Sequence, residues 1–472
     1  MAAVKPGYSI GQPSSRILIL FILTACLFAE LSTTQAQDVF ETATPIATAS
    51  PGAYGTVALT PTVLATISGI ARAYVSECRF ENRVKNYDKA IANCTAAIEL
   101  SPKFELAFAN RAEAYNSKGE YDLAIADSNY AITLNPKDAT PYVNRGIAYE
   151  EKGDYARAIA DYDQAISLNP KDASAYDNRG NTYDLMGDLV HALADYDQAI
   201  SLNPKNIIAY NNRGNAYREK GRNDLALADY NQAIYSYPND PMAYNNRGLL
   251  YHSEGHDDLA MQDYTYAVAV DPTYAPSYFN RGVLYASQGQ LVQAIEDYNE
   301  TILLDPKHAP AYNYRGYAHY KQGQDDLAVA DYSQAVALDP RYTLAYLDRG
   351  LAYKRQHKYD QALADYNQAL AISPKLVAIY FFRGNLYADQ GMTQLALADY
   401  HQAINIDPKY ADVYWAIGLV YDSQHRYADA LENYRQYVEI AGKKASETVV
   451  SRIGELEALL SATEDATQAT TP

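Results

Sequence analysis

The feature that most constrains this chain is an internal repetition with a fixed period. The segment DYDQAISLNPK occupies residues 161–171 and recurs unchanged at residues 195–205. Ten prolines, from Pro102 to Pro408, follow one another at intervals of 34 residues without an exception. Such a period is typical of repeat proteins, in which each unit buries its apolar face only by stacking on its neighbours. With the proline at position 32 of the unit, eleven repeats cover residues 71–444.

Each repeat has the pattern of two helices. In the repeat 139–172, aromatic residues at positions 4 and 11 and a glycine at position 8 mark one face of a first helix. A glycine at position 15 ends that helix, and Ala158, Tyr162 and Ala165 form one face of a second. Pro170 ends the second helix, because proline lacks an amide donor and restricts the residue before it. The pattern predicts helix, turn, helix and loop.

Small residues indicate where the two helices of a repeat meet. Position 20 is alanine in all eleven repeats, and position 8 is glycine in nine, from Gly146 to Gly418. Small residues let two backbones approach closely, while aromatic side chains at positions 4, 11 and 24 fill the space around them. We therefore interpret the tyrosine stripe at these positions as core.

This pattern resembles the tetratricopeptide repeat, and the resemblance covers roughly four fifths of the chain. Two departures are an arginine at position 7, where the family usually has leucine, and Cys78 and Glu81 in place of glycine and tyrosine in the first repeat. The resemblance implies an all-α fold, a right-handed superhelical solenoid of eleven 34-residue helix-turn-helix repeats whose first helices line a concave groove. Such folds generally bind proteins or peptides.

The N-terminal region reads as an export signal over residues 1–36. Lys5 and Arg16 precede an apolar run at residues 17–29, which is too short to span a membrane. We expect cleavage after Ala36, with two alternatives: a lipid on Cys26, because LTAC resembles a bacterial lipobox, and a retained membrane anchor. All three predict a secreted or envelope-anchored extracytoplasmic protein, which meets the membrane only through this anchor or lipid.

The segments on either side of the repeats are predicted from composition and periodicity. Residues 37–70 are rich in Thr, Ala and Pro, which predicts a flexible linker. Residues 445–462 place Val449, Ile453, Leu456 and Leu460 on one helical face, as expected of a capping helix on the last repeat. Residues 463–472 are predicted to be a disordered tail.

Charge and motifs exclude several classes of function. The net charge is −18 and no basic patch occurs, so nucleic acid is not an expected partner. The sequence has no glycine-rich phosphate loop, nucleophile elbow or zinc-protease helix, so neither an enzyme nor a cofactor is predicted. His252 and His256 are separated by a turn glycine, and we interpret them as exposed histidines rather than metal ligands.

The groove-facing positions implied by the resemblance are 2, 5, 6, 9, 12 and 13 of each repeat. Position 6 is asparagine in six consecutive repeats: Asn110, Asn144, Asn178, Asn212, Asn246 and Asn280. A carboxamide offers a donor and an acceptor to the backbone of an extended peptide, and a similar asparagine ladder lines the superhelix of the O-linked N-acetylglucosamine transferases. Further amides predicted to contact the peptide are Asn181, Asn211, Asn215 and Asn245. The alternative is that these amides were copied with the repeat or satisfy neighbouring loops.

The later repeats carry aromatic residues at groove-facing positions. Phe279, Tyr317, Phe381 and Trp415 are predicted to bind apolar side chains of a ligand. The family's carboxylate clamp is not expected, because Arg72 is the only base at position 2 and its repeat has Ser76 at position 6.

These features together predict an exported scaffold that binds extended segments of a partner protein. The alternatives are a structural protein that organises envelope complexes through its convex face or ends, and a substrate-binding arm for a separate enzyme.

Two further sets of residues are predicted to be structural. Arginine at position 7 and aspartate at position 23 occur together in repeats two to ten, and the terminal repeats lack both. This co-occurrence predicts ion pairs within each repeat, unless the consensus was duplicated whole and the terminal repeats drifted. The central examples are Arg145–Asp161, Arg179–Asp195 and Arg213–Asp229. In the first repeat, Cys78 and Cys94 replace residues where the helices touch, and either a disulfide or two buried thiols fit this placement.

Overall fold

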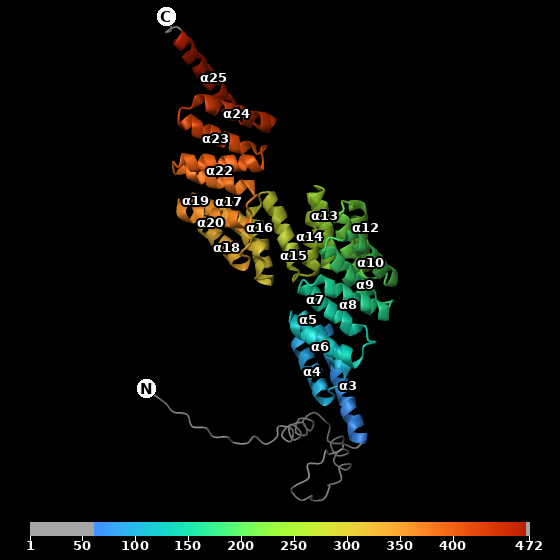
Figure 1. Cartoon of the computed structure of the whole chain (residues 1–472). Helices are drawn as coiled ribbons and strands as arrows, with labels where there is room; N and C mark the ends of the chain where they lie inside the picture. Colours follow the sequence, from blue (N-terminus) through green and yellow to red (C-terminus); the bar gives the residue numbers. More distant parts are fainter. Residues whose placement is uncertain (1–60, 469–472) are drawn as a thin grey trace, which may run out of the picture. The chain divides into compact units, whose positions relative to one another are not determined.

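The computed structural model of the chain describes the backbone of residues 61–468 and the side chains of residues 64–462. Every regular element in this range is helical, and Figure 1 shows the helices following one another in pairs. The predicted signal, its cleavage and lipid sites and most of the predicted linker lie outside the described residues. None of the helices within 61–468 is both long and apolar enough to cross a membrane.

The helices are α3 (Pro61–Arg83), α4 (Tyr87–Leu100), α5 (Glu105–Ser117), α6 (Tyr121–Leu134), α7 (Thr140–Glu151), α8 (Tyr155–Leu168), α9 (Ala173–Leu185), α10 (Leu189–Leu202), α11 (Ile207–Glu219), α12 (Asn223–Ser236), α13 (Pro241–Ser253), α14 (Asp257–Val270), α15 (Ala275–Ser287), α16 (Leu291–Leu304), α17 (Ala309–Lys321), α18 (Asp325–Leu338), α19 (Thr343–Arg355), α20 (Tyr359–Ile372), α21 (Val377–Asp389), α22 (Thr393–Ile406), α23 (Ala411–Ser423), α24 (Tyr427–Ala441), the 3-10 helix η1 (Gly442–Lys444) and α25 (Glu447–Gln468).

The repeats are helix pairs, from α3 and α4 in the first to α23 and α24 in the eleventh. From α4 to α25, each α-helix packs on the next one along the chain. In addition, first helices contact the first helices of adjacent repeats, for example α5 with α7 and α21 with α23. The second helices of adjacent repeats make no comparable contact among the described residues. Direct contacts between like helices of adjacent repeats are therefore made by the first helices.

The two helices of a repeat meet at position 8 of the first and position 24 of the second. In repeat three, a Cβ on Gly146 would lie only 2.6 Å from Cε1 of the fully buried Tyr162. The same close approach recurs in the following repeats. In repeat two, where Ala112 holds position 8, the facing residue is the small Ser128. A glycine is therefore required wherever position 24 is a tyrosine.

The first repeat replaces this contact by a covalent bond. Cys78 on α3 and Cys94 on α4 form a disulfide, with their Cα atoms 5.5 Å apart. Both residues are fully buried. Of the two possibilities that the sequence leaves open, the structure has the disulfide.

Both ends of the helical array extend beyond the predicted boundaries. Helix α3 begins at Pro61, within the segment predicted to be linker, and a proline is well suited to the first helical position. Helix α25 buries Val449 and Leu456 against α24 and continues to Gln468 instead of ending at residue 462. The predicted boundaries at residues 70 and 462 therefore lie inside helices α3 and α25.

Candidate functional site

The asparagines at position 6 lie on the first helices, and most of their amide groups bond to the preceding repeat. Nδ2 of Asn144 donates to the Ala109 carbonyl oxygen (2.8 Å), and Nδ2 of Asn212 donates to Asp177 (3.3 Å). Nδ2 of Asn246 donates to Oδ1 of Asn211 (3.3 Å), and Nδ2 of Asn280 donates to Oδ1 of Asn245 (2.8 Å). In Asn110, Nδ2 donates to the Leu106 carbonyl of its own helix, and Oδ1 accepts from Arg79. Five of the six amides therefore hold adjacent repeats together, four as donors and Asn110 as an acceptor, through contacts between helices rather than with loops.

Part of the ladder is exposed and has no hydrogen-bond partner within the described chain. Asn178 is partly exposed, and its side chain makes no hydrogen bond within the described chain. The Oδ1 atoms of Asn144, Asn212, Asn246 and Asn280 accept no hydrogen bond from the described residues. The exposure of these residues is uneven, since Asn144 and Asn246 are buried while Asn212 and Asn280 are partly exposed. The open part of the ladder is thus Asn178, Asn212 and Asn280.

The additional amides are used inside the protein. Asn211 and Asn245 are 0% and 4% exposed, because position 5 faces the next repeat and not the open surface. The prediction that these two contact a ligand is wrong. Asn181 donates to Oε1 of Glu150 at 2.8 Å, and Asn215 accepts from a tyrosine hydroxyl of its own repeat at 2.8 Å.

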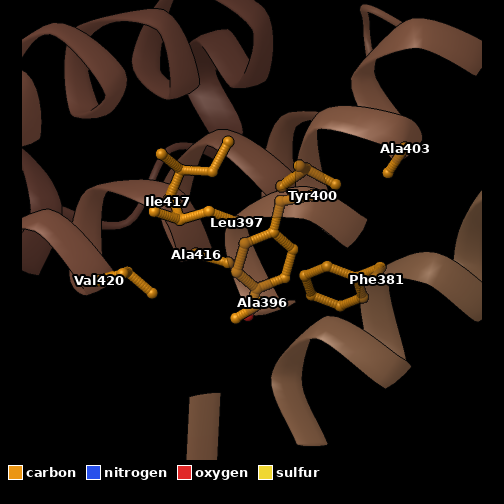
Figure 2. Close-up of a cluster of buried hydrophobic side chains, with 9 residues drawn as sticks. Phe381, Ala396, Leu397, Tyr400, Ala403, Ala416, Ile417 and Val420 are labelled. Carbon is orange, nitrogen blue, oxygen red and sulfur yellow. The ribbon is translucent and has the colours of Figure 1, made fainter. Parts of the chain in front are cut away.

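The predicted aromatic anchors divide into buried and exposed residues. Figure 2 shows Phe381 beside Tyr400 in the hydrophobic core, where its side chain is buried, so its predicted role as an anchor is wrong. Phe279 packs edge-on against Tyr314, with ring centroids 5.3 Å apart. In contrast, Tyr317 and Trp415 are each 39% exposed and remain available to a ligand.

A group of carboxylates that the sequence analysis missed lies on α7 and α9. Glu150 accepts from Asn181 and Thr182 of the next repeat, and Asp177 accepts from Asn212. Burial raises the pKa of Glu150 and of Asp184, and it raises the pKa of Asp177 to about 6, against the hydrogen bond from Asn212. A search for recurring residues overlooks this group, because Asp177 is the one charged residue at position 5.

The raised pKa of Asp177 predicts a pH-dependent stability. The folded state holds a proton on this carboxyl up to about pH 6, whereas the unfolded chain releases it near pH 4. This contribution to stability is therefore full below about pH 4 and is lost as the pH rises to about 6. The substitution Asp177→Asn, which keeps the acceptor for Asn212, should raise the free energy of unfolding by about 2 kcal/mol at pH 7.5.

Urea denaturation of the variant and the wild type at pH 4 and pH 7.5 checks this prediction. The difference between the two proteins should vanish at pH 4. Asp224→Asn is the matched control, because Asp224 is exposed on α12 and should behave like the wild type at both pH values. An equal effect of Asp177→Asn at both pH values would contradict the assignment.

The arginines at position 7 each form two parallel hydrogen bonds with the aspartate of their own repeat. The shortest nitrogen–oxygen distances are Arg111–Asp127 2.7 Å, Arg145–Asp161 2.6 Å, Arg179–Asp195 2.7 Å, Arg213–Asp229 2.6 Å, Arg247–Asp263 2.7 Å, Arg281–Asp297 2.8 Å, Arg315–Asp331 2.6 Å, Arg349–Asp365 2.7 Å and Arg383–Asp399 2.7 Å. These aspartates are buried on the second helices. The pairs join the first helix of each repeat to its second helix.

The third nitrogen of the guanidinium group makes a contact that the sequence did not reveal. In eight of the nine repeats, Nη1 donates to the residue at position 25 of the preceding repeat, for example from Arg145 to Asn129 and from Arg213 to Asp197. Position 25 varies among Thr, Asn, Asp and Ser in these repeats, which is why no pattern marked it. The arginine therefore links neighbouring repeats as well as the two helices of one repeat.

The consecutive packing of helix pairs defines a class of protein, an all-α solenoid. Models described as TPR repeat match residues 214–255, 316–357 and 384–424. Models described as tetratricopeptide repeat match residues 111–177, 173–206, 195–228, 243–274, 275–308, 343–376 and 411–444. These matches cover more than half of the chain, which belongs to the tetratricopeptide repeat family. This fold is generally a non-enzymatic scaffold for protein–protein interaction.

Several solved structures are similar to this chain. The Cut9–Hcn1 hetero-tetramer of APC/C is 15% identical, with 84% of this chain and 99% of that chain covered and a TM-score of 0.47. Yeast Tom70 is 16% identical, with 84% and 96% covered and a TM-score of 0.40. YrrB, described as a TPR protein with an unusual peptide-binding site, is 25% identical, with 39% and 95% covered and a TM-score of 0.30. No curated protein matches the sequence.

Proposed function

We propose that this chain is an exported scaffold that binds an extended peptide segment of a partner protein along its first helices. The observation that carries the proposal is the open part of the asparagine ladder, Asn178, Asn212 and Asn280. These side chains are partly exposed on one surface and keep amide oxygens that accept no hydrogen bond from the described protein. Tyr317 and Trp415, further along the same set of helices, add exposed aromatic surface.

The sharpest test of the groove is Asn178→Ala. Because this side chain makes no hydrogen bond within the described chain, its removal should leave the thermal unfolding temperature nearly unchanged. Loss of one hydrogen bond to a peptide should weaken binding by about 0.5–1.5 kcal/mol, or roughly twofold to tenfold in Kd. Isothermal titration with a partner identified by pulldown and mass spectrometry measures this effect.

Asn144→Ala is the matched control for that variant. Asn144 donates to the backbone of the preceding repeat, so its loss should lower stability by about 1 kcal/mol. Its effect on peptide affinity should be smaller than that of Asn178→Ala, because Asn144 is buried. Unchanged affinity in an intact Asn178→Ala protein would remove the peptide-groove proposal.

A second candidate function is assembly of larger complexes through the second helices. Exposed apolar side chains favour it: Val190 is 69% exposed, Tyr235 82% and Leu303 72%. Such residues are suited to contacts with other proteins. Replacing all three by serine should then abolish partner recovery in a pulldown while Asn178→Ala leaves it intact. The use of the scaffold as the substrate-binding arm of a separate enzyme remains the third candidate.

Export is part of the proposal and has its own support. The apolar run and small residues of the N-terminal sequence are typical of a signal peptide. The disulfide between Cys78 and Cys94 fits an oxidising compartment. We expect the mature protein in the extracytoplasmic fraction, beginning at Gln37 or carrying a lipid on Cys26. Mass spectrometry of the purified mature protein distinguishes these forms, and an unprocessed cytosolic chain would contradict export.

A further inference from the structure

Position 6, which forms the asparagine ladder, changes character in repeats eight to ten, where it holds Tyr314, Asp348 and Phe382. These residues lie on the first helices α17, α19 and α21, and each of these helices contacts the next first helix. Tyr314 is 38% exposed, and Asp348 and Phe382 are partly exposed. A carboxylate therefore lies between two aromatic side chains at the same position of successive repeats.

Asp348 is joined to α17 by one hydrogen bond and has no counter-charge. Nδ2 of Asn313 donates to Oδ2 of Asp348 at 3.2 Å, while Oδ1 of Asp348 accepts no hydrogen bond from the described residues. The carboxylate also forms no ion pair within the described chain, whereas the neighbouring Arg349 pairs with Asp365 at 2.7 Å. A half-buried carboxylate without a positive partner lowers stability, and such exceptions are expected at functional sites.

The carboxamide of Asn313 adds a second unpaired oxygen beside Asp348. Asn313 is 5% exposed, and its Oδ1 atom is buried without a hydrogen-bond partner. The other two asparagines at position 5 differ, because Oδ1 of Asn211 and Oδ1 of Asn245 each accept from the ladder asparagine of the next repeat. Nearly all buried polar atoms in proteins are hydrogen-bonded, so this exception is informative. The partial negative charge of the unpaired oxygen adds to that of the carboxylate, so this part of the chain attracts cations.

The aromatic rings of α17 are also suited to cations. The ammonium group of Lys321 lies 5.3 Å from the ring centroid of Tyr317. The guanidinium group of Arg355 lies 3.5 Å from the ring centroid of Tyr320. Both tyrosines share α17 with Tyr314, over whose ring no cation of the described chain lies. Because the faces of aromatic rings attract cations, the ring of Tyr314 offers an open place for one.

We propose that Asp348 binds the ammonium group of a lysine side chain in the partner's peptide segment, with the ring of Tyr314 beside it. This inference rests on the proposed peptide groove, because the segment would continue from the open part of the asparagine ladder onto position 6 of the later repeats. Lysine fits better than arginine, because Oδ2 of Asp348 already accepts from Asn313 and only Oδ1 remains unpaired. A guanidinium group is suited to two parallel hydrogen bonds, whereas an ammonium group can use one oxygen and the face of a ring.

The test uses the full mature chain and a displayed random peptide library at pH 7.5. Burial raises the pKa of Asp348 to about 6, so this carboxyl is ionised there. The variant is Asp348→Asn, which keeps an oxygen for the Asn313 amide and removes the charge. Asp360→Asn is the matched control, because Asp360 is exposed on α20. Asp348→Asn should unfold at the same temperature as the wild type or a higher one, since it removes a half-buried charge.

We expect the wild type and the control to enrich peptides that share a lysine at one position. Asp348→Asn should lose this preference and bind a selected peptide about tenfold more weakly. Replacing that lysine by norleucine should weaken binding to the wild type by a similar factor and leave binding to Asp348→Asn unchanged. Tyr314→Leu should weaken binding about threefold, whereas Tyr314→Phe, which keeps the ring, should not. Circular dichroism confirms that each variant is folded.

The other outcomes overturn the inference in distinguishable ways. Selected peptides without a common lysine, or an unchanged Kd in Asp348→Asn, would refute the lysine site and leave the peptide groove in place. Arginine enriched as strongly as lysine would refute the choice of an ammonium group. No enriched peptide at all would refute the groove and the lysine site together. Binding of n-butylammonium by the wild type but not by Asp348→Asn, with no peptide enriched, would replace the peptide by a free amine.

Discussion

Replacing Gly384 by alanine is expected to lower the free energy of unfolding by about 3 kcal/mol. A Cβ at this position would lie 2.5 Å from Cε1 and 2.8 Å from Cδ1 of Tyr400. These distances are well inside ordinary carbon–carbon contact, which begins at about 3.5 Å. Either the tyrosine ring or the first helix of the repeat must therefore move.

Tyr400 has little freedom to move. Its hydroxyl donates to Oδ1 of Asn385 at 2.7 Å, and its ring lies among Phe381, Leu397 and Ala416 in the core cluster of Figure 2. The ring centroid of Phe381 is 6.4 Å from that of Tyr400. Because the surrounding core is densely packed, the added methyl group must separate the two helices of the repeat.

Gly454→Ala is the matched control for this prediction. Gly454 is also in a helix, α25, but a Cβ there would meet nothing within 4 Å. Alanine has the higher helix propensity, so this variant should be unchanged or more stable by up to about 1 kcal/mol. Urea unfolding followed by circular dichroism measures both variants. Equal stability of Gly384→Ala and the wild type would show that the repeat is packed more loosely than described.

Asp161→Asn is expected to lower the free energy of unfolding by about 2–3 kcal/mol. The two carboxylate oxygens of Asp161 accept from Nη2 and Nε of Arg145 at 2.6 and 2.8 Å, and the Arg145 side chain is only 20% exposed. The hydrogen bond to Asp161 raises the pKa of Arg145, which remains charged. Its other partner, Asn129, is neutral, so the variant leaves a partly buried cation without a counter-charge.

Asp195→Asn is the internal comparison, because Arg179, the partner of Asp195, also pairs with a second carboxylate. Arg179 also bonds to Asp163 of the preceding repeat at 2.5 Å, so this variant should lose less stability than Asp161→Asn. Combining Arg145→Leu with Asp161→Asn should recover part of the loss, because the unpaired charge is removed. Equal losses in the two aspartate variants, with no recovery in the double variant, would show that charge compensation is not the cause.

The sequence predicted the architecture because the same local pattern occurs in eleven consecutive repeats. The glycine at position 8, the alanine at position 20 and the proline at position 32 recur with one spacing, and each has a local reason in helix packing or termination. The arginine–aspartate pattern likewise gave the residues of the nine ion pairs, because their absence from the same two repeats marked them as partners.

The sequence was less informative about the candidate site, where residues differ between repeats. Position 5 was assigned to the groove, yet Asn211 and Asn245 are buried between repeats and Phe381 belongs to the core. The arginine contact to position 25 and the hydrogen bonds of Glu150 with Asn181 and Thr182 had no recurring signal at all.

The sequence by itself thus determined that this chain is a stack of eleven helix pairs, since helix periodicity and termination depend on neighbours along the chain. Only the tertiary structure decided which amides bridge adjacent repeats, which aromatic rings are buried, and that Cys78 and Cys94 are bonded. The physical reason is that contacts between stacked helices depend on the angle and separation at which they pack. These quantities bring together residues about 16 to 35 positions apart, and no local pattern specifies them.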